Sequence, residues 1–241
     1  MALKPHIFVS RPLPAAVERY LREHCQTSIW NGSEKLSRER FFSEIQNAEG
    51  LLTSSGSIDA VLFDHAPKLK IVSNISVGYN NFDLDEMKRR GIMGTHTPGV
   101  LDDSVADLIM SLMLSAARRV PELDRLVRDG GWLKGADDAL FGVDVHHAKL
   151  GIIGMGRIGE ALAKRAKFGF DMQISYHNRR RNPEVESRFD AAYASVDQLL
   201  AESDFVVVMT PLTPETEGMI GAAQFAKMKR SAIFINASAV K

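Results

Sequence analysis

The stretch that decides the fold is Leu150-Gly-Ile-Ile-Gly-Met-Gly-Arg-Ile-Gly159, where an apolar run leads into spaced glycines and then into a helical pattern. A G-x-G-x-x-G string in this setting is typical of a βαβ unit that binds a dinucleotide. Gly154 allows the tight turn, Gly156 removes the side chain that would block a pyrophosphate, and Gly159 lets the helix pack closely on the strand. The alternative is a glycine-rich turn that binds nothing.

The end of the next predicted strand indicates which dinucleotide is bound. It reads Ser175-Tyr-His-Asn-Arg-Arg-Arg181, and His177 stands where an NAD site normally carries an acidic residue, about twenty positions after the glycines. Asn178, Arg179 and Arg180 follow it. A carboxylate would repel a 2′-phosphate, whereas guanidinium groups can bind one through charge-assisted hydrogen bonds. The sequence therefore predicts NADP, with NADPH preferred over NADH; the alternative is a solvated basic turn.

Composition and charge exclude several classes of protein. Lys plus Arg and Asp plus Glu number 30 each, so no global field attracts nucleic acid or an anionic membrane surface. The longest other apolar stretch, 108–117, is about half the ~20 residues that a membrane span needs. Cys25 is the single cysteine, and the first residues are too weakly apolar for a signal peptide. We expect a cytoplasmic protein with neither nucleic acid nor membrane as partner.

Strand and helix patterns alternate along the whole chain. Strand patterns fall at 6–10, 50–53, 70–73, 150–153, 173–176, 205–209 and 232–235, and helical patterns at 14–24, 158–168, 195–202 and 222–229. Such alternation is typical of parallel sheets with helices on their faces. A passage rich in turn residues, 91–99, separates the two series. We therefore predict an α/β protein of two domains, residues 1–100 and 101–241.

Two segments follow the predicted boundary. Residues 101–119 form a helical pattern that is apolar on nearly every face, and we expect it to be buried between the domains, with Asp102, Asp103 and Ser104 as N-terminal caps. Residues 129–147 are rich in Gly and Asp and predict a long surface loop. Adjacent histidines in that loop, His146 and His147, lack a cluster of carboxylates or cysteines, so no metal site is predicted.

Several separated strings together carry a family resemblance. They are Gly50-Leu-Leu-Thr-Ser54, Ile75-Ser-Val-Gly-Tyr-Asn-Asn-Phe-Asp83, Thr97-Pro-Gly-Val-Leu101, the glycine stretch, Thr210-Pro-Leu-Thr-Pro-Glu-Thr216 and Phe234-Ile-Asn236. In this order, over essentially the whole chain, they resemble the D-isomer-specific 2-hydroxyacid dehydrogenases, most closely the glyoxylate/hydroxypyruvate reductases of the 2-ketogluconate reductase type. The resemblance implies a flavodoxin-like substrate domain followed by a doubly wound NAD(P)-binding domain, the second incomplete.

The resemblance also implies roles for particular residues. Backbone N–H groups of Val77 and Gly78 would bind the substrate carboxylate. Gly154 and Gly159 belong to the implied cofactor-binding loop, in which Gly156, Arg157 and Ile158 would line the pyrophosphate. The other cofactor-binding residues would be Asn178, Arg179 and Arg180 at the 2′-phosphate, Thr210, Pro211 and Thr216 on the adenosine side, and Ala237 near the nicotinamide. The implied reaction is hydride transfer from NADPH to a small 2-oxoacid, and the implied assembly is a homodimer.

The sequence departs from the family at its end. Relatives carry a catalytic Arg three residues after the Ile-Asn string, and Ala239 stands there. The family's Glu and His positions would lie beyond Lys241, so no catalytic residue is assigned and we expect a truncated chain. Three hypotheses stay open: an active NADPH-dependent reductase of glyoxylate and hydroxypyruvate, an inactive remnant that binds only the dinucleotide, and a dinucleotide-sensing interaction protein of the corepressor type.

Overall fold

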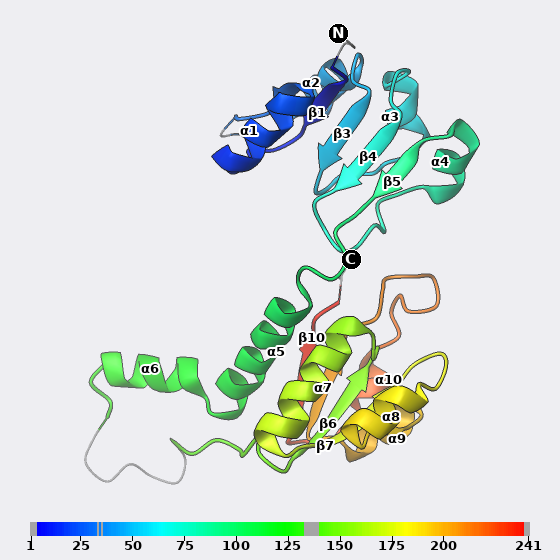
Figure 1. Cartoon of the computed structure of the whole chain (residues 1–241). Helices are drawn as coiled ribbons and strands as arrows, with labels where there is room; N and C mark the ends of the chain where they lie inside the picture. The colour runs from blue at the N-terminus through cyan, green and yellow to red at the C-terminus, as the bar shows by residue number, and fades with distance from the viewer. Residues whose placement is uncertain (1–3, 33, 35, 133–139, 239–241) are drawn as a thin grey trace. The chain divides into compact units, whose positions relative to one another are not determined.

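The computed structural model describes residues 4–32, 34, 36–132 and 140–238. Within it the chain forms two compact units, residues 1–99 and 100–241 (Figure 1). Both units are built on a five-stranded parallel sheet, which confirms the predicted α/β class. No described helix is both long enough and apolar enough to span a bilayer.

The first unit alternates strands and helices from end to end. Its elements are β1 (His6–Val9), α1 (Ala15–His24), β2 (Gln26–Ile29), α2 (Arg38–Ile45), β3 (Gly50–Thr53), α3 (Ala60–His65), β4 (Ile71–Asn74), α4 (Leu84–Arg90) and β5 (Met93–Thr95). The strand order β2-β1-β3-β4-β5 is that of flavodoxin-like sheets. Strand β2 is added on one side of β1, and β3, β4 and β5 are added in turn on its other side. Right-handed crossovers therefore put α1 on one face of the sheet and the other three helices on the opposite face.

One buried cluster holds the first unit together. Phe8, Leu51 and Val72 project from neighbouring strands onto Leu62 and Phe63 of α3, and all are at most 3% exposed. By contrast, α1 has no buried residue. The main core of this unit therefore lies between the sheet and helices α2 to α4.

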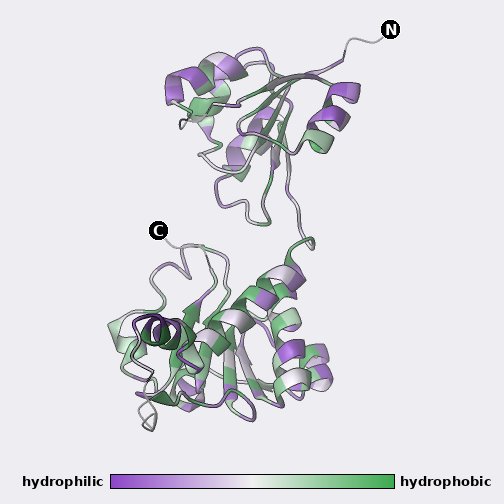
Figure 2. Cartoon of the chain, turned by 90° about the vertical axis from the view of Figure 1, so that its left-hand side faces the viewer, coloured by the Kyte–Doolittle hydropathy of each residue, from purple (hydrophilic) through white to green (hydrophobic). Residues whose placement is uncertain are grey.

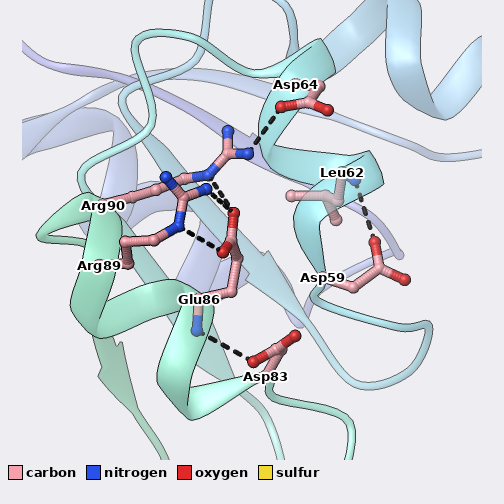
Figure 3. A network of polar contacts seen from close by, with 7 residues as sticks. All are labelled: Asp59, Leu62, Asp64, Asp83, Glu86, Arg89 and Arg90. Carbon is pink, nitrogen blue, oxygen red and sulfur yellow. Dashed lines mark hydrogen bonds and ion pairs between the residues drawn. The ribbon is translucent and has the colours of Figure 1, made fainter.

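Helices α3 and α4 are also joined by a network of charges (Figure 3). Glu86 accepts hydrogen bonds from Arg89 and from Arg90, and Arg90 also donates to Asp64 of α3 at 2.7 Å. These bonds to Arg89 and Arg90 lower the pKa of Glu86 to about 2. Asp83 caps α4 by accepting from the Glu86 N–H at 3.0 Å. The network fixes the two helices side by side on one face of the sheet.

The second unit begins with two helices and continues as a second alternating series. Its elements are α5 (Asp102–Ala117), α6 (Val120–Arg128), β6 (Lys149–Ile153), α7 (Arg157–Phe170), β7 (Gln173–His177), α8 (Pro183–Phe189), β8 (Ala192–Tyr193), α9 (Val196–Glu202), β9 (Phe205–Val208), α10 (Ala222–Phe225) and β10 (Ile233–Asn236). The strand order is β10-β9-β6-β7-β8, so β6 is central. Strands β7 and β8 are added on one side of β6 and strands β9 and β10 on the other, which makes the position between β6 and β9 the switch point of the sheet.

Both faces of the second sheet are covered. Ile152 and Val207 belong to one buried cluster, which includes residues of α5, α7 and α8, while Ile153 and Val206 belong to another with residues of α9. Successive strand residues point to opposite faces, so a strand that is buried on both faces reads as a continuous apolar run. This explains why β6 and β9 were predictable from their composition.

Helix α5 departs from one expectation. Its N-cap is Leu101, without a side-chain cap, because Asp102 and Asp103 pair instead with Arg157 and Arg165 of α7. It is rich in apolar residues (Figure 2), yet only one face is buried, and Leu108 remains 58% exposed. The prediction of Asp102, Asp103 and Ser104 as caps was therefore wrong. The expectation that this helix is buried between the domains stays a prediction.

The other differences concern elements that the sequence did not predict and the ends of those that it did. The unpredicted elements are β2, β5 and β8 and the helices α2, α3, α4, α6 and α8. The helix predicted over 222–229 is shorter, since α10 stops at Phe225 and the N–H groups of Lys227 and Met228 bond to carbonyls only three residues back. Such bonding tightens the chain into a 3₁₀-like turn. Part of the predicted loop over 129–147, residues 133–139, lies outside the described residues.

Candidate functional site

The glycine loop after β6 has the geometry that its sequence predicts. Gly154 has φ +102°, and a Cβ there would lie 2.8 Å from the backbone of Met209, so only glycine fits without strain. A Cβ on Gly159 would lie 2.9 Å from the carbonyl oxygen of Gly154. A Cβ on Gly156, by contrast, would meet nothing within 4 Å. Two glycines therefore permit close packing, and the third faces open space.

Some backbone N–H groups of this loop donate hydrogen bonds within the chain, and others do not. Those of Gly154 and Gly156 donate to the carbonyl oxygens of His177 and Gly154, at 3.0 and 2.9 Å. The first helical bond of α7 is from Glu160 to Gly156, so the N–H groups of Arg157, Ile158 and Gly159 have no partner within the described chain. Three adjacent free donors at a helix N-terminus, beside the open space at Gly156, fit an anion such as a pyrophosphate.

The turn after β7 separates its three arginines by role. Arg181 donates to Glu186 at 2.9 and 2.7 Å and lies over the ring of Tyr193. Arg179 and Arg180 are exposed, and among the described residues neither makes a hydrogen bond or an ion pair. Two guanidinium groups are thus available to a ligand, while the third is committed to α8.

Hydrogen bonds of Tyr176 and His177, the last two residues of β7, hold this turn in place. The Tyr176 hydroxyl donates to Glu186 at 2.8 Å and accepts from the Asn182 N–H at 2.7 Å. Hydrogen bonds from Arg181 and Tyr176 lower the pKa of Glu186, and burial raises the pKa of Tyr176. His177, in the place of the usual acid, bonds through Nδ1 to the carbonyl oxygen of Ala194 at 2.9 Å. The turn is held at several points before any ligand arrives.

The loop after β9 lies against the glycine loop. Thr210, Pro211 and Thr216 line a pocket of about 470 Å³, together with Phe225 and Phe234. The backbone N of Thr210 lies 2.9 Å from where a Cβ of Gly154 would be. A hydrogen bond from Thr213 and the positive charge of Arg179 lower the pKa of Glu215, at the tip of this loop. Loops after β6, β7 and β9 therefore meet at one edge of the sheet.

The remaining predicted residues fall in three places. Ala237 directly follows β10, and its N–H donates to Val208 at 2.9 Å. Ala239 lies outside the described residues. Val77 and Gly78 follow β4 in the first unit, where the Gly78 carbonyl oxygen accepts from Asn74 at 3.1 Å. The N–H groups of Val77 and Gly78 have no partner in the described chain, as expected of an anion-binding loop.

Three structural contacts were not predicted from the sequence. Arg157 forms an ion pair through Nε with Asp102 at 3.2 Å, and Tyr193 donates from its hydroxyl to the Asn178 carbonyl oxygen at 3.0 Å. The third contact is the ion pair between Arg181 and the Glu186 carboxylate, which leaves Arg181 unavailable to a ligand. An arginine followed five residues later by a glutamate at a helix start was the only local signal, and it is common.

Comparison with known proteins gives a consistent result. A family model described as D-isomer specific 2-hydroxyacid dehydrogenase, NAD binding domain, matches residues 110–239. The chain is 48% identical over 235 residues to glyoxylate/hydroxypyruvate reductase B of Erwinia tasmaniensis, covering 98% of this chain and 73% of that protein.

Solved structures agree with these matches. The TT0316 protein of Thermus thermophilus superposes with a TM-score of 0.89 at 38% identity, covering 97% of this chain and 73% of that one. A glyoxylate reductase of Paecilomyes thermophila superposes with a TM-score of 0.84 at 28% identity, covering 99% of this chain and 74% of that one. The fold described above is thus shared with both of these proteins.

Proposed function

The chain belongs to the family of D-isomer-specific 2-hydroxyacid dehydrogenases, and from this premise we propose that it serves the NADPH-dependent reduction of a small 2-oxoacid. Glyoxylate and hydroxypyruvate are the proposed substrates, because relatives at 48% identity carry these names. The larger 2-ketogluconate is a further member of the same substrate class. The products are the corresponding 2-hydroxyacids.

The observation that carries the cofactor proposal is the pairing of two anion sites on adjacent loops. Free N–H groups of Arg157, Ile158 and Gly159 suit the pyrophosphate that NADH and NADPH share. Arg179 and Arg180, without ion pairs in the described chain, suit the 2′-phosphate that only NADPH carries. Thr210, Pro211 and Thr216, on the loop after β9, would border the adenosine, and Ala237 would approach the nicotinamide.

The substrate proposal rests on the first unit. We propose that residues 1–100 are the substrate domain and residues 101–241 the NAD(P)-binding domain. The free N–H groups of Val77 and Gly78 would bind the substrate carboxylate and so orient the neighbouring carbonyl. The nicotinamide supplies the hydride when bound. The residues of this chain would then bind the dinucleotide and the 2-oxoacid, and Arg179 and Arg180 would favour NADPH over NADH.

A second candidate function is dinucleotide binding without turnover. Hydride addition to a carbonyl builds negative charge on the oxygen, and that oxygen needs a cation and a proton donor. Ala239, at the family's arginine position, can supply neither. This residue favours the second candidate, while the intact glycine loop is common to both.

One experiment separates the candidates. The purified chain is titrated with NADPH by calorimetry, and NADPH oxidation is then followed with glyoxylate, hydroxypyruvate and 2-ketogluconate. Binding with turnover supports the reductase, and binding without turnover supports the second candidate. Absence of any binding by folded protein contradicts both.

We further propose that the protein is a cytoplasmic homodimer. Helix α6 follows α5 directly and has no buried residue, and Val120 and Val127 of α6 are 51% and 53% exposed. Leu108 and Leu112 of α5 are also exposed, at 58% and 46%. Burial of such a surface against a second copy would be favourable. Light scattering should give a dimer for the wild type and for Val17→Asp on α1, but a monomer for Val127→Asp.

A further inference from the structure

Asn178 occupies an unusual place between the two anion sites. Its side-chain Oδ1 accepts the N–H of Met155 at 2.7 Å, and its Nδ2 donates to the carbonyl oxygen of the same residue at 3.1 Å. Met155 is the second residue of the glycine loop. The amide of Asn178 therefore engages both backbone polar groups of one loop residue, although the two residues are 23 positions apart.

The hydrogen bonds between Asn178 and Met155 extend the bonding between β6 and β7 beyond the last backbone pair. The last backbone bond between β6 and β7 is from the N–H of Gly154 to the carbonyl oxygen of His177 at 3.0 Å. Beyond it the two chains diverge into the glycine loop and the arginine turn. The Asn178 side chain provides the next donor and acceptor in place of a backbone peptide. Without it, Met155, which is 3% exposed, would leave two backbone groups without partners.

Asn178 is itself held in position. Its carbonyl oxygen accepts from the Tyr193 hydroxyl at 3.0 Å, and the Tyr193 ring stacks on His177 with centroids 5.7 Å apart. Asn182, four residues further on, holds the other end of the turn by capping α8 through Glu184 and Val185. Asn182 makes no contact with the glycine loop among the bonds of the described chain.

We propose that Asn178 is a positioning residue that shapes the pyrophosphate-binding loop, so that affinity for the part shared by NADH and NADPH depends on a residue of the turn that selects the 2′-phosphate. With both polar ends of its amide on Met155, Asn178 aligns the free N–H groups of Arg157 and Ile158 and lets Arg179 and Arg180 alone read the 2′-phosphate. This inference rests on the proposed dinucleotide function.

The test compares variants by calorimetry with NADH and with NADPH, at a temperature where each is fully folded. Asn178→Ala should weaken both ligands by a similar factor, roughly tenfold, because the loop loses two hydrogen bonds. The double variant Arg179→Ala/Arg180→Ala should weaken NADPH alone. Asn182→Ala is the matched control: it removes an asparagine from the same turn and costs stability, but should leave both affinities unchanged.

A spectroscopic readout follows the loop without any ligand. The protein is labelled with ¹⁵N-methionine, and the Met155 signal is assigned with Met155→Leu. Hydrogen exchange of the Met155 N–H should accelerate in Asn178→Ala and stay slow in Asn182→Ala. Tyr193→Phe, which keeps the ring but loses the hydroxyl, should weaken both ligands less than Asn178→Ala does.

The outcomes are distinguishable. If Asn178→Ala weakens NADPH only, Asn178 contacts the 2′-phosphate directly, and the positioning role is wrong while the proposed function stands. Unchanged affinity for both ligands also overturns the positioning role. If the wild type binds neither dinucleotide, the proposed function fails and the inference fails with it. Parallel loss of both ligands with faster exchange at Met155 supports the inference.

Discussion

The two sheets have five parallel strands each but differ in how they are covered and tied. The second sheet has buried clusters on both faces, whereas the buried cluster of the first lies on the side of α2 to α4. In the second, the glycine loop is fixed by Asn178 and by the backbone at Met209. In the first, the loop at Val77 and Gly78 is open enough that a Cβ on Gly78 would meet nothing within 4 Å. A loop glycine is intolerant of change where its Cα packs against another segment, as at Gly154, and tolerant where it faces open space, as at Gly78.

The largest expected effect is at Gly154. Gly154→Ala places a Cβ 2.8 Å from the Met209 backbone at a φ of +102°. We expect the free energy of unfolding to fall by more than about 3 kcal/mol, and NADPH binding to be lost. Gly78→Ala in the first unit is the control and should change stability by less than about 0.5 kcal/mol. Urea denaturation measures both. Equal stability of the two variants would contradict the comparison.

Truncation of a side chain in the second core should come next. Ile152 lies in the central strand and is 0% exposed, so Ile152→Ala should cost about 2–5 kcal/mol. Val17 on α1 is 43% exposed, and Val17→Ala should cost at most about 0.5 kcal/mol. A large loss from Val17→Ala in denaturation experiments would show that the face of the first sheet under α1 is a second core after all.

The arginine turn allows a smaller but more specific test. Replacing Arg179 and Arg180 by Ala removes two charge-assisted contacts to a 2′-phosphate, and NADPH affinity should fall by about 10–100-fold. NADH is the matched control ligand and should bind as before. Loss of both ligands in the same proportion would mean that these arginines serve the shared pyrophosphate, or the loop itself.

Acid titration should give the smallest effect. Hydrogen bonds from Arg89 and Arg90 lower the pKa of Glu86 from 4.5 to about 2, so its stabilising contribution is complete above pH 4.5 and disappears as the pH falls towards 2. Glu86→Gln should therefore differ from the wild type in denaturation midpoint near neutral pH, and the difference should shrink across this window. A constant difference down to pH 2 would argue against the charge network in Figure 3.

Much of the second unit could be predicted because its signals are local. The glycines at 154, 156 and 159 stand in one short string, and the runs that became β6 and β9 are apolar throughout since both of their faces are buried. The family resemblance, confirmed by the comparisons, also came from contiguous strings. Strand β2 carried no such signal, because Gln26-Thr-Ser-Ile29 has a single apolar residue and lies at the edge of its sheet.

Contacts between distant residues were not predictable in the same way. The sequence singled out Asn178 but not its partner Met155, since nothing in either string encodes a bond across 23 positions. Asp102 was expected to cap its own helix and instead pairs with Arg157 on α7. A carboxylate at a helix start can serve either purpose, and only the packing of α5 on α7 decides between them.

The consecutive order of Asn178, Arg179 and Arg180 has a practical consequence for redesign. In the proposed roles, Asn178 would maintain the nucleotide cradle and stands immediately before Arg179 and Arg180, which would discriminate between nucleotides. An engineer who wishes to exchange the coenzyme preference therefore has two codons to rewrite and one, directly upstream, to leave alone. Libraries that randomise the whole tripeptide would mostly lose the cradle before they could explore selectivity.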